Sequence, residues 1–182
     1  GGAKIFITAT SKRIYDRLRE LKSDGCDAGA LTADLTNRDA VAELINAIIH
    51  ECGHIDILVN NAGMSQTGKD DVYVNMVDLP PREWDIAIDR NLNTCFNITR
   101  EVLPLMIKNR YGRIVNVSSV TGPLVSNPGE TGYSAGKAAM VGMSRSLAIE
   151  VAKDGITVNN VAPGWIATAS VLEEEKIAAL NT

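Results

Sequence analysis

The sequence predicts an α/β fold, in which a parallel sheet is covered by helices on both faces. Short apolar segments alternate with longer helical segments along the chain, which is the pattern of consecutive βα units. The predicted strands are apolar, as expected of strands that are buried on both faces. The composition, with 45% hydrophobic and 22% charged residues in a chain of 182, is that of one globular domain with a hydrophobic core.

The first half of the chain contains three predicted strands and two predicted helices. Short apolar segments near residues 4–8, 28–33 and 55–59 predict the strands. The longer segments between them, near 12–23 and 38–52, predict helices, and parallel strands need connections of this length.

The second half repeats this alternation. Helices are predicted across residues 81–110 and 132–153, and strands at 113–117 and 156–161. The connection at 64–80 is long for a βα loop, so we expect it to flank an active site.

Two residues of the last predicted helix suggest acid–base chemistry. Tyr133 and Lys137 are one helical turn apart, so their side chains share one face. A nearby ammonium ion favours the phenolate form of a tyrosine, which can then exchange a proton with an alcohol or carbonyl oxygen. Ser118 and Ser119 follow a predicted strand, and ligands of open α/β sheets bind at the carboxyl ends of strands. These side chains are therefore expected to form one site.

Four motifs resemble those of the short-chain dehydrogenase/reductase family. They are NNAG at residues 60–63, NVSS at 116–119, YSAGK at 133–137 and PGWIAT at 163–168, in the family's order. The resemblance implies a Rossmann-like, doubly wound parallel sheet and a single, incomplete dinucleotide-binding catalytic domain over residues 1–182. Ketoacyl-reductase-like members look most similar, which implies hydride transfer between NADP(H) and a carbonyl or secondary alcohol. The alternatives are an NAD-linked sugar or polyol dehydrogenase and a truncated, non-catalytic member.

The resemblance also implies four catalytic residues. Tyr133 would be the general acid/base, and Lys137 would assist it and bind the ribose hydroxyls of the nicotinamide. Ser119 would hold the substrate oxygen, and Asn91 would support a water-linked proton path to the lysine. The serine lies fourteen residues before Tyr133, where the family most often has thirteen. The alternatives that stay open are Ser118 for Ser119 and Asn93 for Asn91.

Further residues are implied in cofactor binding. Small residues after the third predicted strand let the backbone approach the adenosine and ribose, and the segment after the second predicted strand flanks the adenine. The last motif would hold the nicotinamide. The residues are Asn60, Ala62 and Gly63 for the adenosine and ribose, Asp34 and Leu35 for the adenine, and Pro163, Gly164, Ile166 and Thr168 for the nicotinamide.

The end of the first predicted strand bears on the choice of cofactor. An acid there prefers the free 2′-hydroxyl of NAD, whereas basic residues accommodate the 2′-phosphate of NADP. This segment contains Thr10, Ser11, Lys12 and Arg13, and the first acid is Asp16. The sequence therefore favours NADP, with NAD as the alternative.

The glycine-rich turn with which the family cradles the cofactor pyrophosphate has no counterpart in the sequence. Residues 4–8 match the family's second strand, so the first strand and its helix are expected to be missing, and the segment after Thr168 is short. Such a gap leaves buried strand edges unpaired, so we expect it to be disfavoured. Three accounts stay open: a segment outside this sequence, a rearranged sheet with residues 5–8 at its centre, or an impaired fragment.

Bulk properties narrow the range of partners. The net charge of −4 gives no reason to expect nucleic acid or an anionic membrane, and no apolar stretch approaches the roughly 20 residues of a membrane helix. Cys26, Cys52 and Cys95 indicate free thiols in a reducing cytoplasm, and His50 and His54 have no metal-ligand spacing. By analogy with the family, we expect a homo-oligomer, a dimer or tetramer, that acts on a small molecule.

Overall fold

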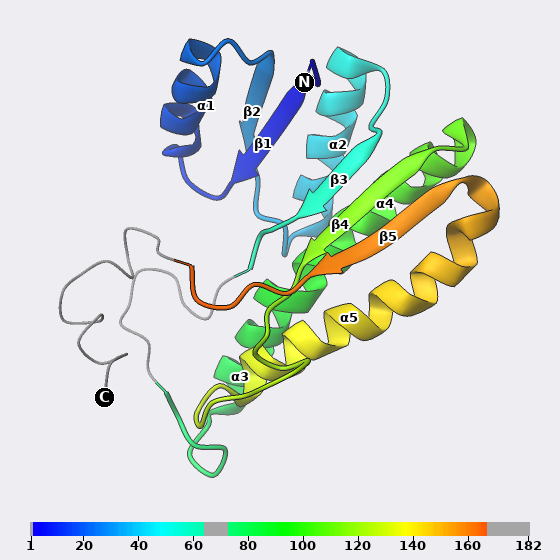
Figure 1. Ribbon diagram of the computed structural model, residues 1–182. Helices are drawn as coiled ribbons and strands as arrows, with labels where there is room; N and C mark the ends of the chain where they lie inside the picture. The colour runs from blue at the N-terminus through cyan, green and yellow to red at the C-terminus, as the bar shows by residue number, and fades with distance from the viewer. Residues whose placement is uncertain (1, 64–72, 167–182) are drawn as a thin grey trace.

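The computed structural model describes residues 2–63 and 73–166, and it consists of alternating strands and helices (Figure 1). The predicted order of elements is confirmed, with bounds that differ by a few residues. Thr168 and much of the predicted connection at 64–80 lie outside the described residues. In the described ranges, no helix is long and apolar enough to span a bilayer. The elements are β1 (Ile5–Ala9), α1 (Ile14–Ser23), β2 (Ala28–Thr32), α2 (Arg38–Cys52), β3 (Ile57–Asn60), α3 (Pro81–Ile88), a π-helical turn (Asp89–Asn93), α4 (Thr94–Asn109), β4 (Gly112–Val117), α5 (Thr131–Val151), a short 3₁₀ turn (Ala152–Asp154) and β5 (Ile156–Val161).

The strands form two sheets, each made of parallel strands. The edge strands β1 and β3 lie on opposite sides of a gap between the two sheets. β1 pairs with β2, whereas β4 pairs with β3 on one side and with β5 on the other. In the part of the chain that the structure describes, β1 and β3 do not pair with each other. The alternative that places residues 5–8 at the centre of the sheet is therefore wrong, since a central strand pairs along both edges. The gap that we expected to be disfavoured is present, and a layer of helices joins the two sheets.

The helical layer contains the hydrophobic core. Val41, Leu44 and Ile45 lie on one face of α2, at the spacing of an amphipathic helix, and pack with Val102 and Met106 of α4. Because the same cluster includes side chains from all three strands of the larger sheet, α2 links the two halves of the molecule. The strands contribute Leu58, Ile114, Ile156 and Val158.

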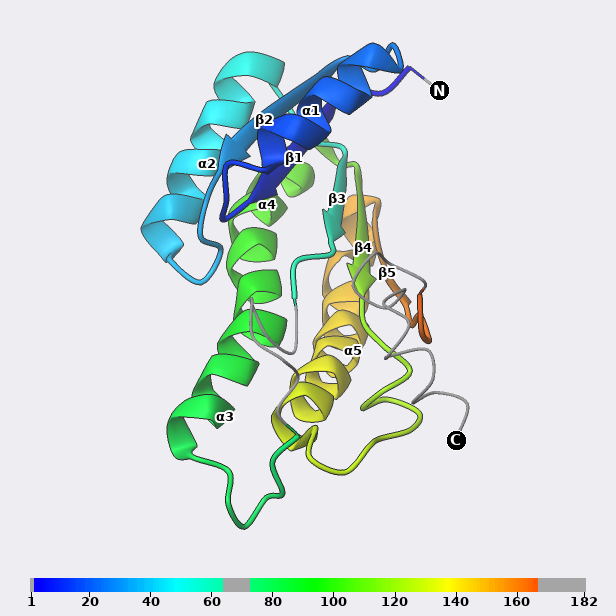
Figure 2. The same ribbon diagram turned by 90° about the vertical axis from the view of Figure 1, so that its left-hand side faces the viewer.

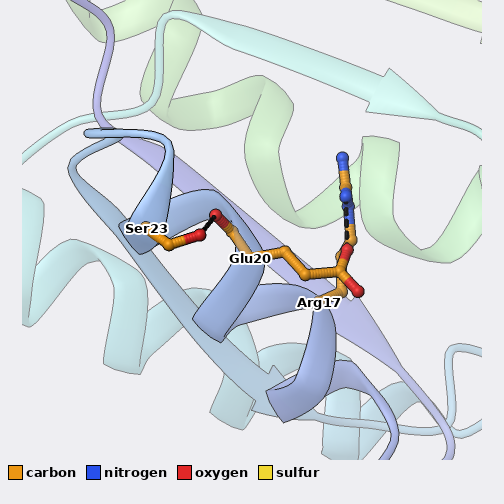
Figure 3. Close-up of polar contacts among 3 residues, drawn as sticks. All are labelled: Arg17, Glu20 and Ser23. Atoms are coloured by element: carbon orange, nitrogen blue, oxygen red, sulfur yellow. Dashed lines mark hydrogen bonds and ion pairs between the residues drawn. The ribbon is translucent and has the colours of Figure 1, made fainter.

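Helix α1 lies on the opposite side of β1 and β2 from α2 (Figures 1 and 2). It contains no buried residue. On its surface, Arg17 Nη1 lies 2.5 Å from Glu20 Oε2, and Ser23 Oγ donates a hydrogen bond to the Glu20 carbonyl at 2.7 Å (Figure 3). Exposed pairs of this kind contribute little to stability, so α1 is held mainly by its packing against β2.

The sheet β3–β4–β5 has helices on one face. Helices α4 and α5 lie on the face that carries the buried side chains of Leu58, Ile114 and Val158 (Figure 2). On the other face, the side chains of Ile57 and Val59 are 57% and 56% exposed. Among the described residues, helices therefore lie on both sides of β1 and β2 and on one side of the larger sheet.

Candidate active site

Lys137 lies inside the molecule, although lysine is seldom buried. It is 3% exposed, and its Nζ donates a hydrogen bond to the Val117 carbonyl at 2.9 Å. Burial lowers the pKa of Lys137, and the smaller influence of Cys95 raises it. Tyr133 lies one turn earlier on α5, and Lys137 Nζ is 5.7 Å from the centroid of its ring. A buried cation next to a partly buried phenol is a candidate for acid–base chemistry.

Two glycines allow α5 to approach the end of α3 closely. A Cβ atom at Gly136 would lie 3.0 Å from Asn91 Cβ, and a Cβ atom at Gly132 would lie 2.8 Å from Ala87 Cβ. Sequence reasoning had not assigned a role to Gly136. The structure shows that this glycine permits the contact between α5 and the π-helical turn that carries Asn91.

Asn91 is fully buried in the π-helical turn between α3 and α4. Its Nδ2 donates a hydrogen bond to the Ala87 carbonyl at 3.0 Å. The predicted alternative, Asn93, is different, because its Nδ2 donates to Asp89 Oδ1 at 2.5 Å in an exposed contact. The structure therefore places Asn91 in the interior, and π-helical turns of this kind are frequent at functional sites.

Gly63 brings the end of the NNAG segment to the same place. A Cβ atom at this position would lie 3.0 Å from Asn91 Oδ1 and 3.2 Å from Lys137 Nζ. Both polar atoms therefore lie close to one point beside the Gly63 backbone. Three of the predicted site residues, from three distant parts of the sequence, meet here.

The two serines after β4 have different surroundings. Ser118 is 4% exposed, and its Oγ donates to the Lys137 carbonyl at 3.0 Å. Ser119 is partly exposed, and its Oγ accepts a hydrogen bond from the Thr121 amide at 3.1 Å. The Ser118 hydroxyl thus fixes α5 to the end of β4. Ser119 is the more exposed of the two, and its hydroxyl retains a proton while it accepts this hydrogen bond.

A buried polar network, which sequence reasoning missed, joins the carboxyl ends of the three strands. Asn60 Nδ2 donates to Thr99 Oγ1 at 2.9 Å and to Asn116 Oδ1 at 2.7 Å. Asn116 Nδ2 donates to Ser144 Oγ at 2.7 Å, and Ser144 Oγ lies 2.9 Å from Asn160 Oδ1.

Asn60 was predicted to line the adenosine and ribose. Its side chain is 6% exposed and bonded within the core, so only its backbone is available to a ligand.

The other residues predicted for the adenosine meet at one end of a cavity between the two sheets. The carboxylate of Asp34 accepts hydrogen bonds from the amide and hydroxyl of Thr36, at 2.9 and 2.7 Å. The side chain of Leu35 belongs to the hydrophobic core, so only its backbone can contact an adenine. The residues that line this end are Thr10, Asp34, Leu35, Asn60, Ala62 and Gly63.

Two exposed segments complete the carboxyl edge of the sheets. After β1, the residues that follow are all exposed: Thr10, Ser11, Lys12 and Arg13.

After β5, the Pro163 carbonyl accepts a hydrogen bond from the Val120 amide at 3.0 Å, and the exposed residues Gly164 and Ile166 follow. The predicted contact at Thr168 lies outside the described residues. Both segments lie at the edge where open parallel sheets bind ligands.

Parallel βα units whose polar groups gather at the carboxyl edge are typical of open α/β sheets, which bind ligands at that edge. Residues 1–177 match the short chain dehydrogenase family. The chain belongs to this family.

Named relatives agree with this assignment. Oxidoreductase UcpA of Salmonella typhimurium is 41% identical over 167 residues, which are 92% of this chain and 61% of UcpA. The chain therefore spans about 61% of the length of that relative. The 3-oxoacyl-(acyl-carrier-protein) reductase FabG of Haemophilus influenzae is 40% identical over 181 residues, which are 98% of this chain and 71% of FabG.

Solved structures confirm the predicted fold class. A protein of the short-chain dehydrogenase/reductase family from Burkholderia xenovorans has a TM-score of 0.85 at 31% identity, with 97% of this chain and 69% of that chain covered. The structure of gox2181 has a TM-score of 0.87 at 28% identity, with 98% and 70% covered.

Proposed function

We propose that the protein transfers a hydride between NADP(H) and a carbonyl or secondary alcohol, as a 3-oxoacyl-reductase-like enzyme. The observation that carries this proposal is the meeting of Gly63, Asn91 and Lys137 beside Tyr133. The similarity to FabG of Haemophilus influenzae supports a 3-oxoacyl substrate.

The residues at the carboxyl edge fit a nicotinamide dinucleotide. The absence of a side chain at Gly63 leaves the backbone open beside Lys137 Nζ, so the ribose of a bound cofactor can approach the lysine. Ala62 and Gly63 would hold the ribose, and Pro163, Gly164 and Ile166 would hold the nicotinamide. When bound, the dinucleotide supplies or accepts the hydride.

The proposed mechanism uses four side chains. In the reductive direction, Tyr133 Oη donates a proton to the substrate oxygen, and Ser119 Oγ holds this oxygen by a hydrogen bond. The positive charge of Lys137 stabilises the phenolate that remains. Asn91, which lies beside Lys137, supports the path by which the proton is replaced. In the oxidative direction, Tyr133 accepts the proton from the alcohol.

The choice of NADP rests on the exposed segment after β1. Lys12 and Arg13 are exposed at the start of α1, where they can meet a 2′-phosphate. Fluorescence titration of the chain with NADPH and with NADH tests this choice. Tighter binding of NADPH is expected, and replacement of Lys12 and Arg13 by alanine should reduce the difference. If the wild type and the alanine variant each bind NADPH and NADH with equal affinity, the assignment of NADP is contradicted.

Tyr133→Phe tests the catalytic role directly. Because the ring is kept and only the hydroxyl is lost, turnover should fall by about 10²–10⁴-fold, the usual contribution of an acid–base group. Reduction of a 3-oxoacyl thioester followed at the NADPH absorbance band measures the loss, and NADPH titration checks that the cofactor still binds. A variant with ordinary turnover would show that another group transfers the proton.

A non-catalytic role is the second candidate, and the gap between the two sheets favours it. The given sequence contains no counterpart of the glycine-rich turn, and among the described residues the edges of β1 and β3 are not joined. In this case the chain would bind neither NADPH nor NADH. The same titration therefore separates the two candidates, provided that the mass of the sample is first confirmed.

A further inference from the structure

Ser118 lies between the end of β4 and helix α5, which carries Tyr133 and Lys137. It directly follows β4, and its amide donates a hydrogen bond to the Val161 carbonyl of β5 at 2.8 Å. Its side chain is buried. Because the sheet holds its backbone and the interior encloses its side chain, Ser118 is a fixed point against which α5 can be positioned.

Two hydrogen bonds join this strand end to Lys137, one to its backbone and one to its ammonium group. The Ser118 hydroxyl donates to the Lys137 carbonyl at 3.0 Å, and Lys137 Nζ donates to the Val117 carbonyl at 2.9 Å. A lysine side chain has several rotatable bonds, so an ammonium group on a helix that is free to shift can take many positions. Because the two partners of Lys137 are consecutive residues of one strand end, they fix its backbone and its ammonium group relative to each other.

The position of the ammonium group matters because two parts of the candidate site lie close to it. A Cβ atom at Gly63 would lie 3.2 Å from Lys137 Nζ, and Nζ is 5.7 Å from the centroid of the Tyr133 ring. The attraction between a positive charge and a phenolate falls with distance, and it is strong where little water is present. A shift of α5 along β4 would therefore weaken the charge that acts on Tyr133 and change the space beside Gly63.

The Ser118 hydroxyl is not available to a substrate in this arrangement. Its side chain is buried, and the single proton of the hydroxyl is directed at the Lys137 carbonyl. Ser119, in contrast, is partly exposed. Any contribution of Ser118 to the reaction therefore acts through Lys137.

We propose that Ser118 is a positioning residue, whose hydroxyl holds Lys137 so that the ammonium group stays beside Tyr133. This inference rests on the proposed function, because Lys137 assists proton transfer only in an enzyme of that kind. The Ser118 side chain itself exchanges neither a proton nor a hydride.

Lysine NMR of the full chain tests the position of the ammonium group. The protein is labelled with ¹³C-lysine, and Lys137→Met identifies the signal of the Lys137 ε-carbon. In Ser118→Ala the hydrogen bond to α5 is lost, so this signal should move toward the signals of the exposed lysines. The matched control is Ser144→Ala, which removes hydrogen bonds of a second buried serine about two turns further along α5 and should leave the signal in place.

Kinetic measurements on the same variants test the consequence for the proposed reaction. With a 3-oxoacyl thioester and saturating NADPH, Ser118→Ala should lower kcat and kcat/KM by the same factor, about tenfold. An equal loss in both is expected when a group is displaced that acts in the transition state, and catalysis is sensitive to small displacements. Ser144→Ala should change neither quantity to this extent.

Each outcome supports or contradicts the proposal. A Lys137 signal that moves in Ser118→Ala alone, together with the equal loss in kcat and kcat/KM, supports it. An unchanged signal in Ser118→Ala, or equal movement in both serine variants, would overturn it. A moved signal with wild-type kinetics contradicts the role in the reaction.

Failure of the proposed function would be seen separately, because the NMR measurement requires no activity. If the wild type shows no turnover while the signal moves only in Ser118→Ala, the function is wrong and the placement of Lys137 by Ser118 stands. If circular dichroism shows that Ser118→Ala does not fold, Ser118→Cys replaces it, because a thiol is of similar size and is a weaker donor. The same movement of the signal is then expected, to a smaller extent.

Discussion

The two sheets of the molecule are stabilised in different ways. In β3–β4–β5, buried apolar side chains face the helices, and a polar network from Asn60 to Asn160 joins the carboxyl ends of the strands. In β1–β2, every residue of β1 is only partly buried, and α1 contributes no buried residue. The residues proposed for proton transfer, and most of those proposed for the cofactor, therefore depend on the larger sheet, whereas the smaller sheet carries Lys12 and Arg13, which are proposed to meet a 2′-phosphate.

The largest expected difference between the two sheets is in the loss of stability when an apolar side chain is shortened. Met106 of α4 is fully buried, so Met106→Ala should lower the free energy of unfolding by about 2–5 kcal/mol. Ile7→Ala in β1 should cost about 1 kcal/mol, because less apolar surface is lost there. Urea unfolding of both variants measures the difference. Equal losses would show that the smaller sheet is as strongly packed as the larger one.

Disruption of the buried polar network should have the next largest effect on stability. Asn116→Leu removes the partner of Asn60 Nδ2 and Ser144 Oγ and leaves buried polar groups unsatisfied, which should cost about 1–3 kcal/mol. The control is Asn127→Ala, which removes an exposed contact to Glu130 and should change stability by about 0.5 kcal/mol or less. If thermal unfolding shows the same small change for both, the network does not stabilise the sheet.

A substitution at Gly63 should lower activity. In Gly63→Ala, the added Cβ atom would lie 3.0 Å from Asn91 Oδ1 and 3.2 Å from Lys137 Nζ. Displacement of these groups should lower kcat/KM by about tenfold, because catalysis is sensitive to small errors in position. The matched control is Gly142→Ala on α5, where a Cβ atom meets nothing within 4 Å. Similar kinetics in both variants would argue against a role for the Gly63 contact.

The pH dependence of stability should show the smallest effect. Burial lowers the pKa of Lys137 below its ordinary value of 10.5 in the folded state. Between the folded pKa and 10.5, the unfolded chain binds more protons, so the stability contributed by this site rises with pH. Urea unfolding across an alkaline series should show a rise for the wild type relative to Lys137→Met. Parallel curves would mean that the pKa of Lys137 is the same in both states.

The positions of the helices and strands could be predicted because their signals are local. Helix α2, for example, begins after Asn37, whose side chain accepts hydrogen bonds from the amides of Asp39 and Ala40. It ends at Gly53, whose φ of 78° favours glycine. Signals of this kind are carried by a few neighbouring residues, so they can be found without knowledge of the tertiary structure.

Contacts between distant segments could not be predicted in the same way. The motif that contains Asn60 indicated a ligand contact, but whether this side chain faces a ligand or the core depends on Thr99 and Asn116, which come from other elements. Likewise, the reason for a glycine at position 136 is the nearness of Asn91. The pairing of strands is also decided by distant residues, and the sequence left two arrangements of residues 5–8 open.

The π-helical turn at Asp89–Asn93 lies between α3 and α4, so the number of residues in this turn sets how α3 is rotated relative to α4. Each residue of an α-helix turns the chain by about 100°, so the removal of one residue here would rotate α3 relative to α4 by about that angle. Asn91 would then leave its place beside Lys137, and the contact of Ala87 with α5 would be lost. A deletion of a single residue at this point should therefore harm the site more than many substitutions within it, even though the helix itself would become more regular.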